Sequence, residues 1–169
     1  MATRHHRDEI ESYLNTLLEV DRFKDYGPNG LQVEGRAEVR RVVSGVTASL
    51  ALIDAAVADG ADAIVVHHGL FWRGQDGRLV QWLGERVRRL MAHGISLFAY
   101  HLPLDAHPTL GNNAQLGSRL GLEADSRFGE QDLGFAGPAG DNESLAALTA
   151  RVQRALGGRA PLVLAGDGR

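Results

Sequence analysis

The chain has 169 residues, of which 44% are hydrophobic and 23% charged, and this composition is typical of a soluble globular protein of ordinary domain size. Eighteen Lys and Arg against 21 Asp and Glu give a formal charge of -3, so nucleic acid is not expected as a main ligand. The absence of cysteine excludes disulfides, thiolate-bound zinc and thiol catalysis.

The chain shows neither a secretory signal nor an apolar run of the ~20 residues that a membrane span needs. We therefore expect a cytoplasmic protein without a membrane partner.

Helical and strand patterns alternate along the first part of the chain. Apolar residues recur at helical spacing over residues 7–20, and turn-forming residues follow at 25–30. The next predicted segments are a strand at 41–46, a helix at 49–59 with Ser49 as N-cap, a strand at 61–66, a helix at 79–93 and a strand at 95–100.

Four further segments are predicted in the rest of the chain: a helix at 112–120, a strand at 133–137, a helix at 143–156 and a strand at 161–164. Strands that are apolar on both faces and separated by helices indicate an α/β protein. We expect a layered, mostly parallel or mixed sheet with helices on its faces, in a single domain over residues 1–169.

Polar side chains gather where the strands at 61–66 and 95–100 end. The carboxyl ends of neighbouring parallel strands share one edge of a sheet, which is where ligands bind in open α/β folds. The residues that would meet at this edge are His67, His68, His101, Asp105 and His107.

Imidazole and carboxylate groups are good ligands for zinc, iron, manganese and similar divalent ions. Adjacent strand residues point to opposite faces, so we expect His67 and His68 to serve two different ions. Asp105 could bridge two ions about 3.5–4 Å apart, as dinuclear hydrolases require.

Each of these residues also has an ordinary interpretation. A His-His pair is by itself more often loop surface than a ligand. His101 either orients a ligand by a hydrogen bond or relays a proton, and His107 fits an ordinary loop residue. The histidines expected at a frayed N-terminus or a helix end, and not in a site, are His5, His6 and His93.

Other chemistry is weakly indicated. Phe71 and Trp72 either cap a pocket or belong to the core. A helix carrying Arg86, Arg88 and Arg89 favours a solvated charged face over an anion site. Phosphate loops, dinucleotide-binding fingerprints and nucleophile elbows are absent from the sequence.

Three motifs carry a family resemblance. They are Asp25-Tyr-Gly-Pro-Asn-Gly-Leu-Gln-Val-Glu-Gly35, Val66-His-His-Gly-Leu-Phe-Trp72 and Tyr100-His-Leu-Pro-Leu-Asp-Ala-His-Pro-Thr-Leu-Gly-Asn-Asn113. With them the chain resembles the NGG-one-interacting-factor-three-like family, also called GTP cyclohydrolase 1 type 2 homologues, from its first helix to its end.

The resemblance implies an α/β protein with two divalent ions, assembled as a homohexameric ring whose sites face an inner cavity. His67, His68 and Asp105 match the family's metal ligands, and the family name suggests a nucleotide substrate. The family completes its centre with a histidine and a glutamate four residues apart near the C-terminus. Here His107 is the only histidine after Asp105, so we expect the chain to correspond to the N-terminal portion of a longer member, with an incomplete ligand set.

Two functions follow from the resemblance. The first is a metal-dependent hydrolase, of GTP cyclohydrolase type if the family name describes the reaction. The second is a non-enzymatic metal-binding or regulatory module that works as an oligomer. A folded fragment that binds no metal is the ordinary interpretation against which both are tested.

Overall fold

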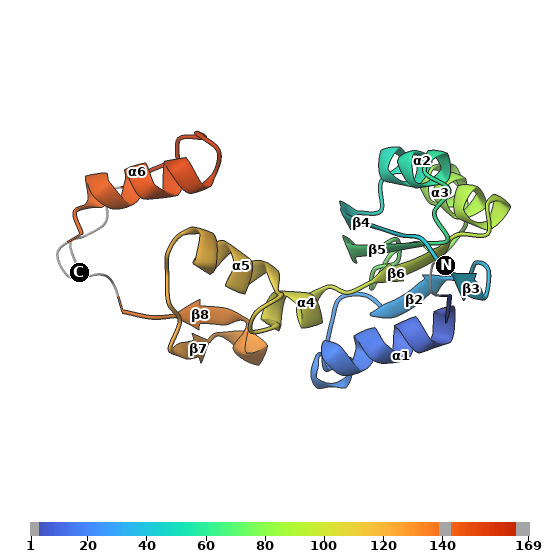
Figure 1. Cartoon of the computed structure of the whole chain (residues 1–169), viewed down its shortest axis with the longest axis horizontal. Helices are drawn as coiled ribbons and strands as arrows, with labels where there is room; N and C mark the ends of the chain where they lie inside the picture. Colours follow the sequence, from blue (N-terminus) through green and yellow to red (C-terminus); the bar gives the residue numbers. More distant parts are fainter. Residues whose placement is uncertain (1–3, 139–142, 165–169) are drawn as a thin grey trace. The chain divides into compact units, whose positions relative to one another are not determined.

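The chain divides into two compact units, Met1–Leu104 and Asp105–Arg169, in a computed structural model that describes residues 4–138 and 143–164 (Figure 1). The first unit contains a four-stranded sheet, and the second contains a pair of short strands. The expectation of one α/β domain over residues 1–169 stays a prediction.

A mixed sheet forms the centre of the first unit. Its strands, in spatial order, are β2 (Gly30–Val33), β6 (Ser96–Ala99), β5 (Ala63–His68) and β4 (Val42–Thr47). β4, β5 and β6 run parallel, while β2 pairs with β6 in the antiparallel direction at one edge. The α/β class with a mostly parallel or mixed sheet is therefore confirmed.

Helices cover both faces of this sheet, α1 on one face and α2 with α3 on the other (Figure 1). Their bounds are α1 (Arg7–Leu17), α2 (Leu50–Ala58) and α3 (Gln81–Ala92). Alternate residues of β5 enter the two cores: Ile64 and Val66 pack in the cluster with α2 and α3, whereas Ala63 and Val65 pack in the cluster with α1. Burial on both faces explains why the central strands are continuous apolar runs.

The helix α2 begins as the sequence predicts. Ser49 is its N-cap, and the Ser49 hydroxyl accepts a hydrogen bond from the backbone N–H of Leu52 at 3.2 Å. The first helix is shorter than expected, because α1 ends at Leu17 and a 3₁₀ turn, η1 (Val20–Arg22), follows.

The expectation of a frayed N-terminus at His5 and His6 is wrong. The two residues form β1 (His5–His6), which pairs with β3 (Glu38–Val39). His6 is also the N-cap of α1, where it exchanges hydrogen bonds with Glu9 in a capping box. These contacts fix the histidines in a structural role.

The second unit contains short elements. They are α4 (Leu102–Ala106), which begins in the first unit, then α5 (Asn112–Arg119), β7 (Ser126–Phe128), η2 (Glu130–Asp132), β8 (Gly134–Ala136) and α6 (Leu145–Ala155). α5, β8 and α6 confirm the helices and the strand predicted for residues 112–156.

The strand predicted at residues 161–164 is wrong. These residues have no regular structure, and the side chains of Leu162 and Leu164 are 84% and 77% exposed. An apolar run becomes a strand only where a neighbouring strand pairs with its backbone, and no described strand does so here.

None of the helices within residues 4–138 and 143–164 has both the length and the apolar character that crossing a membrane takes.

Candidate metal centre

The candidate site lies at the carboxyl ends of β5 and β6. His67 and His68 are the last two residues of β5, so the strand runs two residues past its expected end at Val66. Val66 lies opposite Ala99 of β6 in the parallel register, and His101 follows two residues after Ala99. The register of two buried strands thus brings the three histidines to the same edge of the sheet.

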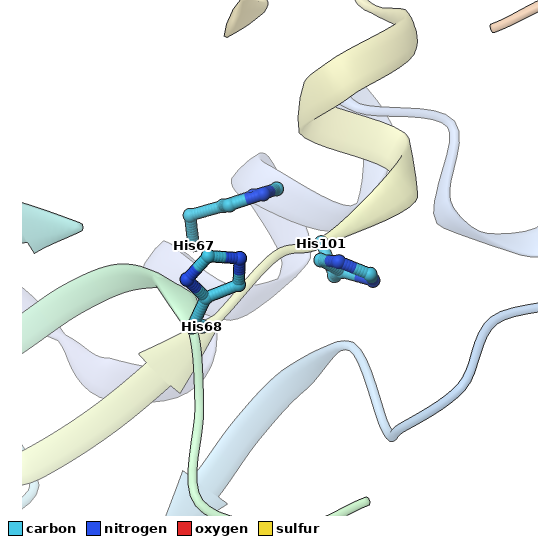
Figure 2. Close-up of side chains that lie close together, drawn as sticks. All are labelled: His67, His68 and His101. Carbon is cyan, nitrogen blue, oxygen red and sulfur yellow. The ribbon is translucent and has the colours of Figure 1, made fainter. Parts of the chain in front are cut away.

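Figure 2 shows the three imidazole rings grouped beyond this edge. The ring centroids of His67 and His101 are 4.8 Å apart, and those of His68 and His101 are 5.6 Å apart. One ring nitrogen from each histidine can be chosen so that all three lie within 4.8 Å of one another. All three side chains are partly buried.

A backbone carbonyl holds the ring of His67. Its Nδ1 lies 3.1 Å from the carbonyl oxygen of Tyr100. A carbonyl oxygen only accepts hydrogen bonds, so Nδ1 carries the proton and the lone pair of the neutral ring is on Nε2.

A carboxylate holds the ring of His101 in the same tautomer. His101 Nδ1 donates to Oδ1 of Asp25 at 2.7 Å, and the Asp25 side chain is only 3% exposed. Burial would raise the pKa of the Asp25 carboxyl, but hydrogen bonds from His101, from Asn29 and from two backbone N–H groups outweigh burial and hold that pKa below its ordinary value. The carboxylate is therefore ionised at neutral pH and leaves the His101 lone pair on Nε2.

The neighbouring strand β4 orients the third ring. Thr47 lies opposite His68 in the parallel register, and the Thr47 hydroxyl is 3.1 Å from His68 Nδ1. A hydroxyl both donates and accepts, so Thr47 can hold either tautomer of His68.

These residues fit a divalent cation. Histidines that bind metal ions generally use one ring nitrogen for the ion and engage the other in a hydrogen bond that fixes the ring, and all three imidazoles have such a partner at Nδ1. Zinc takes imidazole nitrogen at about 2.0–2.1 Å, so nitrogens grouped within 4.8 Å need only small movements to reach one ion. The group of His67, His68 and His101 could therefore hold a metal ion.

Strand alternation does not keep the rings of His67 and His68 apart, and the expectation that they serve two different ions stays a prediction. Their ring centroids are only 4.4 Å apart. His68 is the last residue of β5, so the regular strand geometry on which alternation depends ends there. Alternation consequently gives no argument for two ions.

Trp72 forms a wall beside this group. Its ring meets the His101 ring edge-on at a centroid distance of 5.1 Å and lies 6.2 Å from the His68 ring. Phe71 instead packs against the hydrophobic core. Phe71 therefore follows the core interpretation, whereas a pocket-capping role for Trp72 stays a prediction.

The structure places the other two candidates in the second unit. Asp105 lies in α4 and accepts a hydrogen bond from Nδ2 of Asn112 at 2.9 Å. Its role as a metal ligand stays a prediction. His107 has the expected loop role, because its Nδ1 accepts hydrogen bonds from the backbone N–H groups of Thr109 and Leu110.

Sequence reasoning missed the residues that orient the rings. Asp25 lies in a segment whose composition predicts only a turn, and Thr47 lies in a strand, where threonine is common. The position of Asp25 in one of the three quoted motifs was the available signal.

Known proteins share the sequence and the fold of this chain. A family model described as Duf34/NIF3 (NGG1p interacting factor 3) matches residues 5–169. A GTP cyclohydrolase 1 type 2 homolog of Neisseria meningitidis serogroup A / serotype 4A is 48% identical over 158 residues, which cover 94% of this chain and 63% of the relative. The homolog of Allochromatium vinosum is 60% identical over 114 residues, which cover 68% of this chain and 44% of the relative.

Solved structures agree. The structure of protein ybgI, described as of unknown function, superimposes with a TM-score of 0.82 at 41% identity, over 94% of this chain and 63% of that one. The chain thus spans less than two thirds of the length of the curated relatives and of the solved structure that it matches.

Proposed function

The chain belongs to the Duf34/NIF3 (NGG1p interacting factor 3) family, and on that premise we propose that it binds divalent metal ions in a dinuclear centre and acts as a metal-dependent hydrolase. The observation that carries the proposal is that the rings of His67, His68 and His101 lie close together and are held in the same way. Each ring is held at Nδ1 by an oxygen, and ring nitrogens from all three lie within 4.8 Å of one another. Three imidazoles are a usual donor set for zinc and similar ions.

The second ion of the proposed centre rests on the family resemblance, in which His67, His68 and Asp105 match metal ligands. A carboxylate is the group that bridges two ions in dinuclear hydrolases. Within the second unit, Asp105 accepts a hydrogen bond from Asn112.

Bound divalent cations supply Lewis acidity, which lowers the pKa of a coordinated water to about 7 and polarises a substrate oxygen. The residues of the chain supply orientation. The Tyr100 carbonyl, Thr47 and Asp25 hold the rings, and the Trp72 ring meets the His101 ring edge-on. His101 is the proposed third imidazole ligand for one ion.

The names of the relatives suggest the substrate and the assembly to test. Because they are called GTP cyclohydrolase 1 type 2 homologues, GTP is the first substrate to offer, and hydrolysis would open its imidazole ring. We also propose a cytoplasmic homo-oligomer, in keeping with the ring that the family resemblance implies.

Metal binding is measured on the full chain through its tryptophans. Only two are present, and Trp82 on α3 is 46% exposed, so Trp82→Phe leaves Trp72 as the only tryptophan. Co²⁺ should quench Trp72, and His67→Ala or His68→Ala should weaken its binding at least ~10-fold. His93→Ala is the matched control, because His93 is only the C-cap of α3 and should leave the affinity unchanged.

The number of bound ions, the mass in solution and the catalytic activity test the dinuclear centre, the oligomer and the hydrolase function. Elemental analysis should give two ions per chain in the wild type and one in Asp105→Ala, and the mass in solution should exceed that of a single chain. Metal-loaded protein should release formate from GTP. Equal, negligible binding in wild type, His68→Ala and Asp105→Ala would contradict the metal site, whereas binding without formate would leave a non-enzymatic metal-binding module.

A further inference from the structure

The segment Asp25-Tyr-Gly-Pro-Asn-Gly30 turns the chain, yet its polar side chains also reach the candidate metal centre. We propose that Asp25 is a positioning residue that holds the His101 ring with its Nε2 presented to a divalent cation. This inference rests on the proposed function, because it assumes that the three grouped imidazoles bind a cation.

The Asp25 carboxylate is itself held firmly. Oδ1 accepts from His101 Nδ1 at 2.7 Å and from the Tyr26 backbone N–H at 2.6 Å. Oδ2 accepts from the Leu102 backbone N–H at 2.8 Å and from Asn29 Nδ2 at 3.0 Å. Four donors and a side-chain exposure of 3% hold the Asp25 carboxylate in one orientation. The hydrogen bond that it accepts from Nδ1 then orients the His101 ring.

The same loop also holds the backbone of His101. Oδ1 of Asn29 accepts a hydrogen bond from the His101 backbone N–H at 2.7 Å. Trp72 meets the ring edge-on and limits its rotation on another side. The ring of His101 is thus fixed at its backbone, at Nδ1 and at one edge before any ion binds.

A second buried carboxylate in the same unit makes clear what is special about Asp25. Asp62 accepts hydrogen bonds from the backbone N–H groups of Arg40 and Arg41 and from the Arg36 side chain, so its partners are structural donors. Asp25 instead accepts one of its shortest hydrogen bonds from the imidazole of His101, whose ring lies 4.8 Å from the His67 ring. A carboxylate in this position makes the distal nitrogen of the histidine a stronger metal ligand.

The main test is the affinity of the full chain for Zn²⁺, measured by competition with a coloured chelator. Asp25→Asn keeps the size of the side chain but removes its charge, and we expect Zn²⁺ to bind about 10–100-fold more weakly. The Co²⁺-loaded variant should also show a changed visible absorption spectrum, because the geometry and donor strength of one ligand change.

Asp62→Asn is the matched control. Asp62 immediately precedes β5, at the opposite end of the strand from His67 and His68. Its replacement removes a buried carboxylate from the same unit but touches none of the three histidines, so stability should fall while Zn²⁺ affinity stays within about twofold of wild type.

A double-mutant cycle tests whether Asp25 acts through His101. His101→Ala should weaken Zn²⁺ binding at least as much as Asp25→Asn, and adding Asp25→Asn to His101→Ala should cause no further loss. In the metal-free protein, ¹⁵N NMR of the imidazoles should detect the proton of His101 on Nδ1 in wild type and a tautomer mixture in Asp25→Asn.

The outcomes separate this inference from the proposed function. A wild type that binds no metal would contradict both. A wild type that binds metal, with a folded Asp25→Asn variant that binds it equally well and keeps the His101 tautomer, would overturn the role of Asp25 alone. Equal losses of affinity in Asp25→Asn and Asp62→Asn would assign Asp25 a purely structural role.

Discussion

Asp62 is a buried carboxylate whose contribution to stability depends on pH. It ties the residues before β4 to the start of β5 through the backbone N–H groups of Arg40 and Arg41. Burial would raise the pKa of the Asp62 carboxyl, but two backbone donors and the Arg36 guanidinium outweigh burial and lower that pKa below its ordinary value. The folded state therefore favours the ionised form.

The sign of the pH dependence follows. A carboxyl whose pKa is lower in the folded than in the unfolded state stabilises the fold above its unfolded pKa of about 4, and the stabilisation is lost as pH falls through the folded pKa. We predict that Asp62→Asn lowers the free energy of unfolding by about 1–3 kcal/mol at pH 7 and that this difference shrinks below pH ~4. Urea unfolding of both proteins from pH 3 to 7 measures it.

Asp76→Asn is the control for this experiment. Asp76 pairs with Arg78 on the surface, where water and salt screen the interaction, so its replacement should change stability much less. A difference between wild type and Asp62→Asn that stays constant with pH would contradict the prediction.

The sequence predicts individual site residues only where their own neighbours identify them. His67 and His68 stand directly after an apolar run, so their place at a strand end was predictable. Asp25 was not, because its partner His101 is 76 residues away and its neighbours form an ordinary turn. Alternation failed at His68 because the rule describes regular strand interiors and not strand ends.

The turn at residues 25–30 and the loop after β5 fit closely against each other. A Cβ atom at Gly27 would lie 2.4 Å from the carbonyl oxygen of Phe71, a backbone atom that cannot move aside cheaply. Gln32 accepts a hydrogen bond from the Leu70 backbone N–H at 2.8 Å and strengthens the same contact. The turn thus supports the loop that carries Trp72.

We predict that Gly27→Ala destabilises the protein by about 1–3 kcal/mol, because the added methyl group overpacks this contact. It should also weaken Zn²⁺ binding, since the loop that it displaces follows directly after His68. Gly77→Ala is the matched control: nothing lies within 4 Å of its Cβ position, and it should change stability by no more than about 0.5 kcal/mol. The urea midpoint and the Zn²⁺ affinity are measured for both variants. If the two variants do not differ, the turn and the loop do not fit as closely as described.

Among the strands of the main sheet, the three parallel strands were predictable from the sequence, whereas the antiparallel edge strand β2 was not. β4, β5 and β6 are apolar runs between helices, which is a strong signal. β2 begins with a glycine and has only four residues, and its pairing with β6 shows a bulge or irregular register. The segment at 161–164 has a strand-like composition, but pairing also needs a neighbour.

Among the residues that the structure describes, the buried hydrophobic core lies in the first unit. The buried hydrophobic residues run from Leu18 to Leu102. Among residues 105–138 and 143–164 the hydrophobic side chains are at best partly buried, and several leucines are largely exposed, such as Leu145 at 61%. Apolar surface is therefore exposed to solvent in this part of the chain.

We predict that hydrogen exchange divides the full chain accordingly. Backbone amides of β5 and β6 lie between two buried clusters and should exchange most slowly, near the rate of global unfolding. Amides of α5 and α6, which have no buried residues, should exchange at least ~100-fold faster. Mass spectrometry of peptides from deuterated protein measures both, and uniform protection along the chain would contradict the division.

The hydrogen bond between Asp25 and His101 connects residues that are 76 positions apart in the sequence, and this separation has a thermodynamic consequence. The three segments that form the candidate centre are far apart in the unfolded chain and meet only when the sheet is assembled. A cation that binds them would bind the folded state alone, and free metal at 100 times its dissociation constant would then add about 2.7 kcal/mol to the stability of the fold. Bound metal would thus make global unfolding of the chain rarer, by the factor that this increment in free energy sets.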